Sequence, residues 1–215
     1  IFCYEEIIEL YNPIDAWPKF DEKTASSLCY TSGTTGNPKG VLYSHRSTII
    51  HTLAAANPDA LNISNMDVVM PIAPMFHANA WGIPYVATMV GAKIVLPGKL
   101  LDGENIYNLI EYEEVSFTAA VPTVWLMLFE FLNKNQKILS KLKSCVIGGS
   151  ACPKFMIEEF DKNHESSVDF DFFMIFADFL DAQPTKIRKN HEKIKIHTRF
   201  MIFGEEFDKN HESSV

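Results

Sequence analysis

The chain has 215 residues, of which 47% are hydrophobic and 21% are charged, a balance typical of globular proteins that bury a sizeable core. Its formal net charge of −8 argues against a broad nucleic-acid surface, which requires clustered lysine and arginine. The length allows one or two domains, and nothing in the composition specifies an oligomeric state.

The cysteines and the N-terminal residues bear on cellular location. The four cysteines show no C-x-x-C spacing, so neither a zinc site nor a disulfide framework is indicated, and a reducing compartment is expected. No signal peptide opens the chain, and we therefore expect a cytoplasmic protein. Ile1 stands in place of an initiator methionine and residues 1–11 read as the end of a helix, so we expect the chain to be a fragment.

A loop rich in glycine and hydroxyl residues lies between strand-like runs at residues 27–30 and 41–44. Residues 30–40 read Tyr-Thr-Ser-Gly-Thr-Thr-Gly-Asn-Pro-Lys-Gly. Glycine lets the backbone approach a ligand, successive N–H groups can form an anion-binding concavity, and Lys39 adds a positive charge. Neither Walker A nor G-x-G-x-x-G spacing is present, and a plain linker is disfavoured by the flanking strands. The sequence predicts a polyphosphate site.

The next elements are a helix, a buried strand and a second helix. Ser47 is predicted to cap a helix that runs through Ile49 and Leu53, followed by a strand at 67–72, a helix at 80–90 and a strand at 93–96. Residues 68–92 carry no formal charge, but prolines and glycine interrupt them. We therefore expect a buried strand, loop and helix instead of a transmembrane segment.

The segment after that strand reads Pro-Met-Phe-His-Ala-Asn-Ala-Trp at residues 74–81. Taken alone, His77 is more simply a buried histidine with a hydrogen-bond partner, and Trp81 is more simply a core aromatic residue. No H-E-x-x-H or other metal-ligand spacing occurs anywhere in the chain. The segment gains meaning only from its position after the polyphosphate loop.

Shorter alternating elements complete the first part of the chain. Helices are predicted at 106–112 and 123–132, where Trp125 is expected to pack in the core, and strands at 115–119 and 144–147. The last strand leads into Gly-Gly-Ser-Ala-Cys-Pro at 148–153, a glycine turn before a helix that begins at Pro153. Strands that alternate with helices predict an α/β fold with parallel pairing.

The character of the chain changes after residue 168. Residues 158–168 and 205–215 are the same string, Glu-Glu-Phe-Asp-Lys-Asn-His-Glu-Ser-Ser-Val. Repeats that stack are diverged and need about three copies, so two identical copies indicate a recent duplication or a splice in the gene model. No domain is assigned to residues 169–215.

The three signatures at 30–40, 74–81 and 146–153 resemble, in the same order, those of the adenylate-forming superfamily: acyl-CoA synthetases, luciferases and peptide-synthetase adenylation domains. The stretch 69–98 is especially similar to medium- and long-chain fatty-acyl-CoA synthetases. The resemblance covers about residues 4–161. It implies that residues 1–168 are part of the large N-terminal AMP-binding domain, an α/β domain of parallel-rich sheets with flanking helices.

The resemblance also implies a two-step reaction and a set of site residues. A fatty-acid carboxylate would attack the α-phosphate of ATP to give acyl-AMP and pyrophosphate, and coenzyme A would then form the thioester. His77 would lie beside the carboxylate and Trp81 would line the acyl tunnel. The residues that would contact the nucleotide are Thr31, Ser32, Gly33, Thr34, Thr35, Gly36 and Lys39 at the phosphates and Gly149, Ser150 and Ala151 at the adenylate.

One expected signature does not occur. The family has an aromatic-Gly-x-Thr-Glu motif about twenty residues after Gly-Gly-Ser, whose Glu helps to hold Mg²⁺, and no such string is present here. No metal ligand is assigned, and the ribose-binding Asp, hinge Arg and C-terminal catalytic Lys are not found. We expect a fatty acid–CoA ligase fragment that is inactive alone. The alternatives are a non-catalytic nucleotide- or acyl-binding remnant and a ligase for an aromatic carboxylate.

Overall fold

A six-stranded, all-parallel sheet forms the body of the protein in a computed structural model, which describes residues 4–12, 16–31, 38–149, 153–163, 171–175 and 195–196. The strand order is β4-β3-β5-β6-β7-β8, and every neighbouring pair is parallel. The strands are β3 Val68–Pro71, β4 Lys93–Ile94, β5 Phe117–Ala120, β6 Ser144–Gly148, β7 Asp171–Ile175 and β8 Lys195–Ile196. The predicted α/β fold with parallel pairing is confirmed.

Apolar side chains cover both faces of this sheet, because successive residues of a strand point to opposite sides. On β3, Val69 belongs to one buried cluster and Met70 to the other, and on β6 Val146 and Ile147 divide in the same way. A parallel sheet needs such cover on both faces. The structure therefore has two cores, separated by the sheet.

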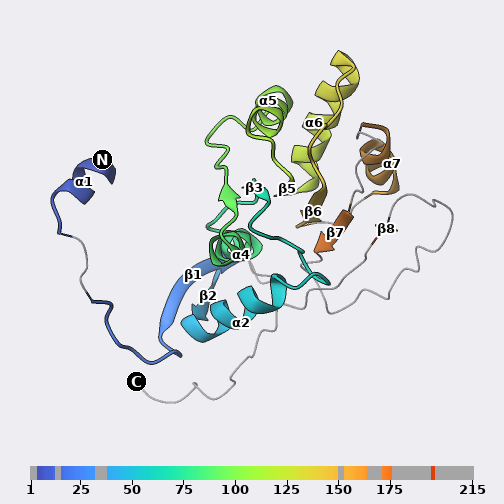
Figure 1. Cartoon of the computed structure of the whole chain (residues 1–215). Helices are drawn as coiled ribbons and strands as arrows, with labels where there is room; N and C mark the ends of the chain where they lie inside the picture. The colour runs from blue at the N-terminus through green and yellow to red at the C-terminus, as the bar shows by residue number, and fades with distance from the viewer. Residues whose placement is uncertain are drawn as a thin grey trace.

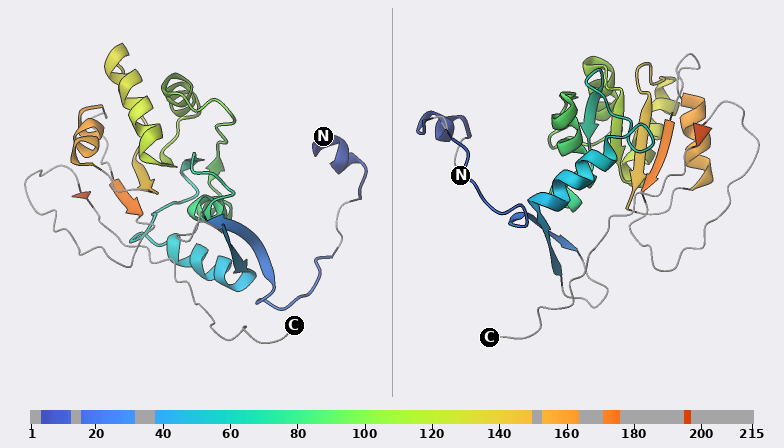
Figure 2. Two further views of the ribbon diagram at one scale, coloured as in Figure 1. Left: turned by 180° about the vertical axis from the view of Figure 1, so that it is seen from behind. Right: turned by 60° about the horizontal axis from the view of Figure 1, so that its bottom comes forward.

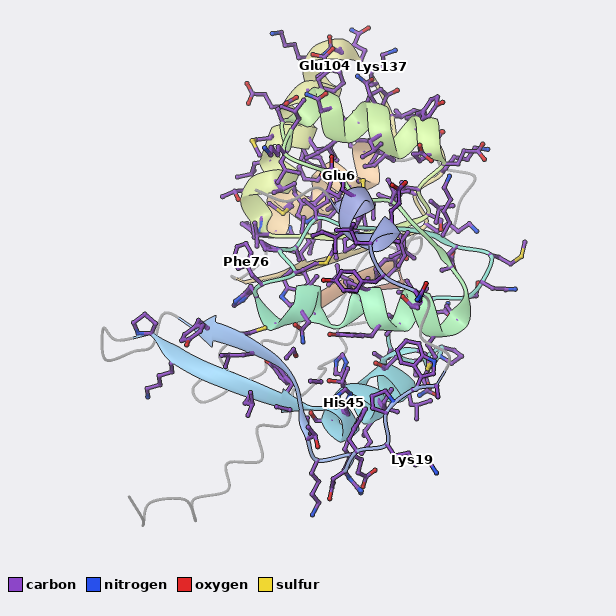
Figure 3. The ribbon with its side chains drawn as sticks, turned by 90° about the vertical axis from the view of Figure 1, so that its left-hand side faces the viewer. Glu6, Lys19, His45, Phe76, Glu104 and Lys137 are labelled. Atoms are coloured by element: carbon purple, nitrogen blue, oxygen red, sulfur yellow. The ribbon has the colours of Figure 1, made fainter. Side chains whose placement is uncertain are left out.

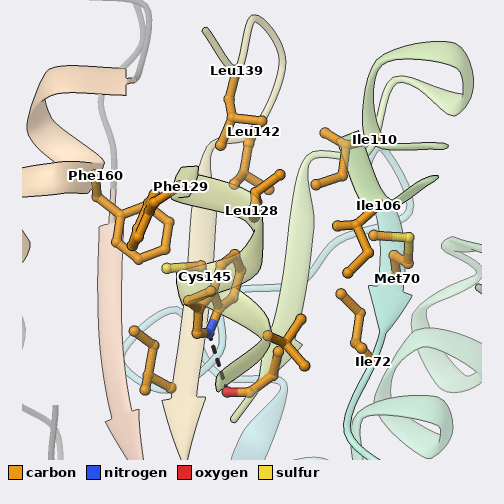
Figure 4. Close-up of a cluster of buried hydrophobic side chains, with 14 of the residues drawn as sticks. Met70, Ile72, Ile106, Ile110, Leu128, Phe129, Leu139, Leu142, Cys145 and Phe160 are labelled. Atoms are coloured by element: carbon orange, nitrogen blue, oxygen red, sulfur yellow. Dashed lines mark hydrogen bonds between the residues drawn. The ribbon is translucent and has the colours of Figure 1, made fainter. Parts of the chain in front are cut away.

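Helices supply the rest of each core. On one face lie α5 Gly103–Glu113, α6 Pro122–Asn135 and α7 Lys154–Asn163, and on the other lies α4 Ile83–Val90 (Figure 1). Figure 4 shows the first cluster, in which Phe129 and Phe160 pack edge to face with ring centroids 4.7 Å apart. Trp125 is fully buried there, as predicted, and its indole Nε1 donates to the Ala120 carbonyl at 3.2 Å.

An antiparallel hairpin projects from the body (Figure 2). It consists of β1 Ala25–Thr31 and β2 Lys39–Ser44, and α2 His45–Ala55 follows directly. We call β1, β2 and α2 together the hairpin lobe. A short helix, α1 Tyr4–Glu9, precedes the lobe.

The cap of α2 differs from the prediction. The helix begins three residues earlier than expected, and Ser44 is its N-cap, with its hydroxyl accepting from the Ser47 backbone N–H at 3.1 Å. Ser47 in turn accepts from the Ser44 backbone N–H at 3.0 Å. The two serines satisfy each other's backbone donors in a capping box. Ser44 is therefore the N-cap, and Ser47, which was predicted as the cap, is the third residue of the helix.

The predicted helix at 80–90 is confirmed over residues 83–90, but its start is wrong, because Gly82 separates α4 from the element before it. That glycine has a φ of 73°, a left-handed conformation that ends α3 Ala78–Trp81 before α4 begins. The charge-free stretch 68–92 is thus a strand and two short helical elements, as its interruptions indicated. Within the part of the chain that the structure describes, no helix is long and apolar enough to cross a membrane.

Candidate functional site

The predicted polyphosphate loop joins the two paired ends of the hairpin. Thr31 is the last residue of β1 and pairs with Lys39, the first residue of β2. The backbone of both residues is therefore fixed by the strand ladder, and Lys39 is exposed. Five other predicted phosphate contacts lie outside the described residues: Ser32, Gly33, Thr34, Thr35 and Gly36.

The second predicted contact region lies at the carboxyl end of β6. Gly149 follows that strand with a φ of 82°, and a Cβ built on it would lie 3.2 Å from Cγ1 of Val121, the residue after β5. The backbone here is thus close to the end of the neighbouring strand. Helix α7 begins at Lys154, one residue after the predicted Pro153. Ser150 and Ala151 lie outside the described residues.

His77 lies beyond the carboxyl end of β3, which pairs with β5. Its backbone N–H donates to the Pro74 carbonyl at 3.0 Å, and its side chain is exposed. In Figure 3, the neighbouring Phe76 projects from the body on the same side as the tip of the hairpin. His77 and Gly149 therefore lie at the same edge of the sheet, where open α/β sheets hold their ligands.

The four residues of α3 adopt a left-handed turn. The φ angles are 46° at Ala78, 51° at Asn79, 50° at Ala80 and 58° at Trp81, close to the left-handed helical value. Trp81 ends this turn and is only 4% exposed, packed in the apolar cluster that also contains Val69 and Phe117. The sequence predicts an apolar environment for Trp81, whereas the turn is not apparent from it.

The Asn79 side chain connects this turn to the hairpin. Its Nδ2 donates to Ser27 Oγ at 2.9 Å, and its Oδ1 accepts from Cys29 Sγ at 3.4 Å. The structure thus brings the segment 77–81 against β1, the strand that leads into the predicted polyphosphate loop. Sequence reasoning missed Asn79, although asparagine is the residue type that best tolerates a left-handed conformation after glycine.

Two side chains of the described part of the chain, on α2 and α7, have shifted pKa values. Burial lowers the pKa of His51, on α2, below its ordinary value. A hydrogen bond from the Asn133 side chain lowers the pKa of Glu159, on α7. Among the residues that the structure describes, no group of three His, Cys, Asp or Glu side chains could hold a metal ion.

A hollow on the surface lies at the opposite end of the hairpin from the loop. It is lined by Phe20, His45 and Ile49 together with the Arg46–Glu22 ion pair. The rings of Phe20 and His45 lie 4.5 Å apart between centroids. These residues flank the base of the hairpin, so the hollow does not belong to the predicted nucleotide site.

Comparison with known proteins gives a consistent result. Residues 8–168 match the family model described as AMP-binding enzyme. Over 161 residues the chain is 53% identical to a medium-chain-fatty-acid–CoA ligase of Ectopseudomonas oleovorans, covering 75% of this chain and 30% of that one. The same identity, length and coverage hold for a 3-methylmercaptopropionyl-CoA ligase of Ruegeria lacuscaerulensis. The chain therefore spans about 30% of the length of these relatives.

Among solved structures, the fold is similar to a long-chain-fatty-acid–CoA ligase from Archaeoglobus fulgidus. The TM-score is 0.60 with 26% sequence identity, and the match covers 69% of this chain and 30% of that one.

Proposed function

The chain belongs to the AMP-binding enzyme family, and from that premise we propose that it is part of an AMP-forming fatty acid–CoA ligase. In this reaction a carboxylate attacks the α-phosphate of ATP, pyrophosphate leaves, and the thiol of coenzyme A then displaces AMP from the acyl-adenylate. We propose that residues 1–168 form part of the N-terminal domain, and we assign no domain to residues 169–215.

The contact between Asn79 and β1 carries this proposal. It joins the segment that holds His77 and Trp81 to the strand that ends at Thr31, where the polyphosphate loop begins. An enzyme that couples a carboxylate to ATP must hold both substrates next to each other, since positioning supplies much of the rate. The contact supports the proposal because it brings the second signature against the strand that leads into the first.

We assign the nucleotide to the hairpin tip and the end of β6. The loop residues 31–36 and Lys39 would hold the β- and γ-phosphates as pyrophosphate leaves, with the Lys39 ammonium opposing their negative charge. Gly149, Ser150 and Ala151 would border the adenylate, where the small side chains let the backbone approach the base. His77 would stand beside the carboxylate.

We propose a fatty acid as the acid that is activated. Trp81 packs among aliphatic side chains of the second cluster, and a mostly apolar pocket with few polar groups suits an alkyl chain. The two relatives described above carry names of a medium-chain fatty acid and of 3-methylmercaptopropionate, both aliphatic acids. An aromatic carboxylate is the alternative that a substrate panel would test.

Magnesium would accompany ATP by resemblance to the family, but we assign no residue of this chain to it. Among the described residues no three His, Cys, Asp or Glu side chains gather where they could hold a metal ion, and the sequence lacks the expected Thr-Glu string. We therefore propose that the chain alone binds substrates without completing the reaction. We also propose a cytoplasmic location, from the cysteine pattern.

Calorimetry on the chain tests the proposal. We expect binding of ATP and of a non-hydrolysable decanoyl sulfamoyl-adenosine, and no acyl-CoA from ATP, decanoate and coenzyme A. Lys39→Ala should weaken ATP binding about tenfold or more, because it removes a charge-assisted contact to phosphate. Lys99→Ala, at another exposed lysine, is the matched control. Equal ATP affinity in the two variants would contradict the assignment of Lys39.

A further inference from the structure

The left-handed turn at Ala78–Trp81 needs support from the rest of the fold. A left-handed backbone brings each Cβ too close to the following carbonyl oxygen, so four consecutive non-glycine residues in this conformation carry a steric penalty. Such conformations persist only where surrounding contacts determine them, and they gather at ligand sites. The turn lies between His77 and Gly82, where the acid site is proposed.

The Asn79 carboxamide supplies that support from both of its polar atoms. Nδ2 is a donor and meets the Ser27 hydroxyl oxygen at 2.9 Å, while Oδ1 is an acceptor and meets the Cys29 thiol at 3.4 Å. Ser27 and Cys29 are two residues apart on β1, so both face the turn. Cys29 is 4% exposed, which shields this contact from competing water.

The two ends of the turn are fixed separately. The segment before the turn is held by the Ala80 N–H, which donates back to the carbonyls of His77 at 3.1 Å and Pro74 at 3.3 Å. At its end, the His51 ring of α2 lies so close to Gly82 that an added Cβ would be 2.4 Å from Cε1. Within the described part of the chain, the two hydrogen bonds of Asn79 are the only side-chain hydrogen bonds that connect the turn to β1.

We propose that Asn79 is a positioning residue for the acid site. By anchoring the turn to β1, it fixes where His77 and Trp81 stand relative to the strand that carries the phosphate loop. This inference rests on the proposed function, because it concerns the same substrates. Loss of the anchor should weaken recognition of the acyl part of the ligand and leave ATP recognition at the hairpin tip nearly unchanged.

Two variants separate the side-chain anchor from the backbone preference. Asn79→Gly keeps a residue that adopts positive φ readily and removes the carboxamide. Ser27→Ala keeps Asn79 and removes one of its partners. The matched control is Asn62→Gly, since Asn62 has the same φ of 51° but lies exposed before β3.

The readouts are calorimetry and amide hydrogen exchange on the whole chain. We expect both variants to bind decanoyl sulfamoyl-adenosine about tenfold more weakly, which is the order of the loss of one hydrogen bond, with ATP affinity within about twofold of the wild type. Exchange should accelerate at residues 77–82 in both variants. Asn62→Gly should change neither binding nor that exchange.

Wild-type exchange at 77–82 in Asn79→Gly and Ser27→Ala would overturn the inference, as would equal losses of ATP and acyl-adenylate binding, which indicate a general structural role. A wild-type chain that binds neither ligand contradicts the proposed function instead. In that case the exchange measurement still decides whether Asn79 anchors the turn.

Discussion

The body and the hairpin lobe differ in how far they bury their apolar side chains. In the body, the large side chains of Trp125, Leu128 and Ile110 are fully buried between the sheet and its helices. In the lobe, Leu42 is 65% exposed and Ile49 is 57% exposed. A two-stranded hairpin is at best marginally stable by itself, so the lobe depends on its inner contacts with the body, while the body stabilises itself. Thr31 and Lys39, which flank the proposed phosphate loop, belong to the lobe.

The largest predicted effect tests whether the body carries the stability. Trp125→Ala should lower the free energy of unfolding by about 4 kcal/mol, because it removes a buried indole and leaves a cavity. Leu42→Ser, on the outer face of the hairpin, should cost less than about 1 kcal/mol, as exposed substitutions do. Urea denaturation of both variants measures the difference. Similar losses would show that the lobe has a core of its own.

An intermediate effect is expected at the joint between the two regions. Gly82→Ala should cost about 3 kcal/mol, because it forces a left-handed φ on alanine and drives its Cβ into the His51 ring. Gly98→Ala is the control: its φ is 70°, but nothing lies within 4 Å of an added Cβ, so it should cost only about 1 kcal/mol. If the two variants unfold at the same urea concentration, the His51 ring of α2 does not lie in close contact with Gly82.

The smallest effect concerns the pH dependence of the same joint. Burial lowers the pKa of His51 below its ordinary value of 6.5, so the unfolded chain binds this proton more tightly than the folded one. The stability that this difference represents is fully present above pH 6.5 and is lost as the pH falls through the lowered folded pKa. Unfolding free energies measured from about pH 7.5 to about pH 5 should therefore fall more steeply in the wild type than in His51→Gln. Identical slopes would mean that the His51 ring stays solvated in the folded chain.

The sequence predicted the body well because its signals there are local. Short β-rich runs separated by helical stretches identify strands and crossover helices, and each predicted strand from 67 to 147 lies within two residues of its observed bounds. Trp125 was predicted as a core residue from its place in an apolar helix and is buried. Strand order and the division of alternate residues between two cores come from tertiary packing, which the local pattern does not specify.

The candidate site was predicted less completely, for a different reason. The glycine at 149 follows from turn chemistry, and its positive φ is observed. The left-handed turn at 78–81 depends on partners about fifty residues earlier in the chain, on β1, which no local pattern reveals. The cap at Ser44 was missed because two serines three residues apart fit the same signal, and the length of the strand decides between them.

The pairing of Thr31 with Lys39 has a consequence for the entropy of ligand binding. Loop closure costs conformational freedom that grows only slowly with loop length, and the strand ladder has already closed this loop at its two ends. A ligand at the hairpin tip therefore does not have to bring distant chain segments together. An insertion in this loop should add little to the entropic cost of closure. Breaking the terminal pair would instead add the whole closure cost to the free energy of ligand binding.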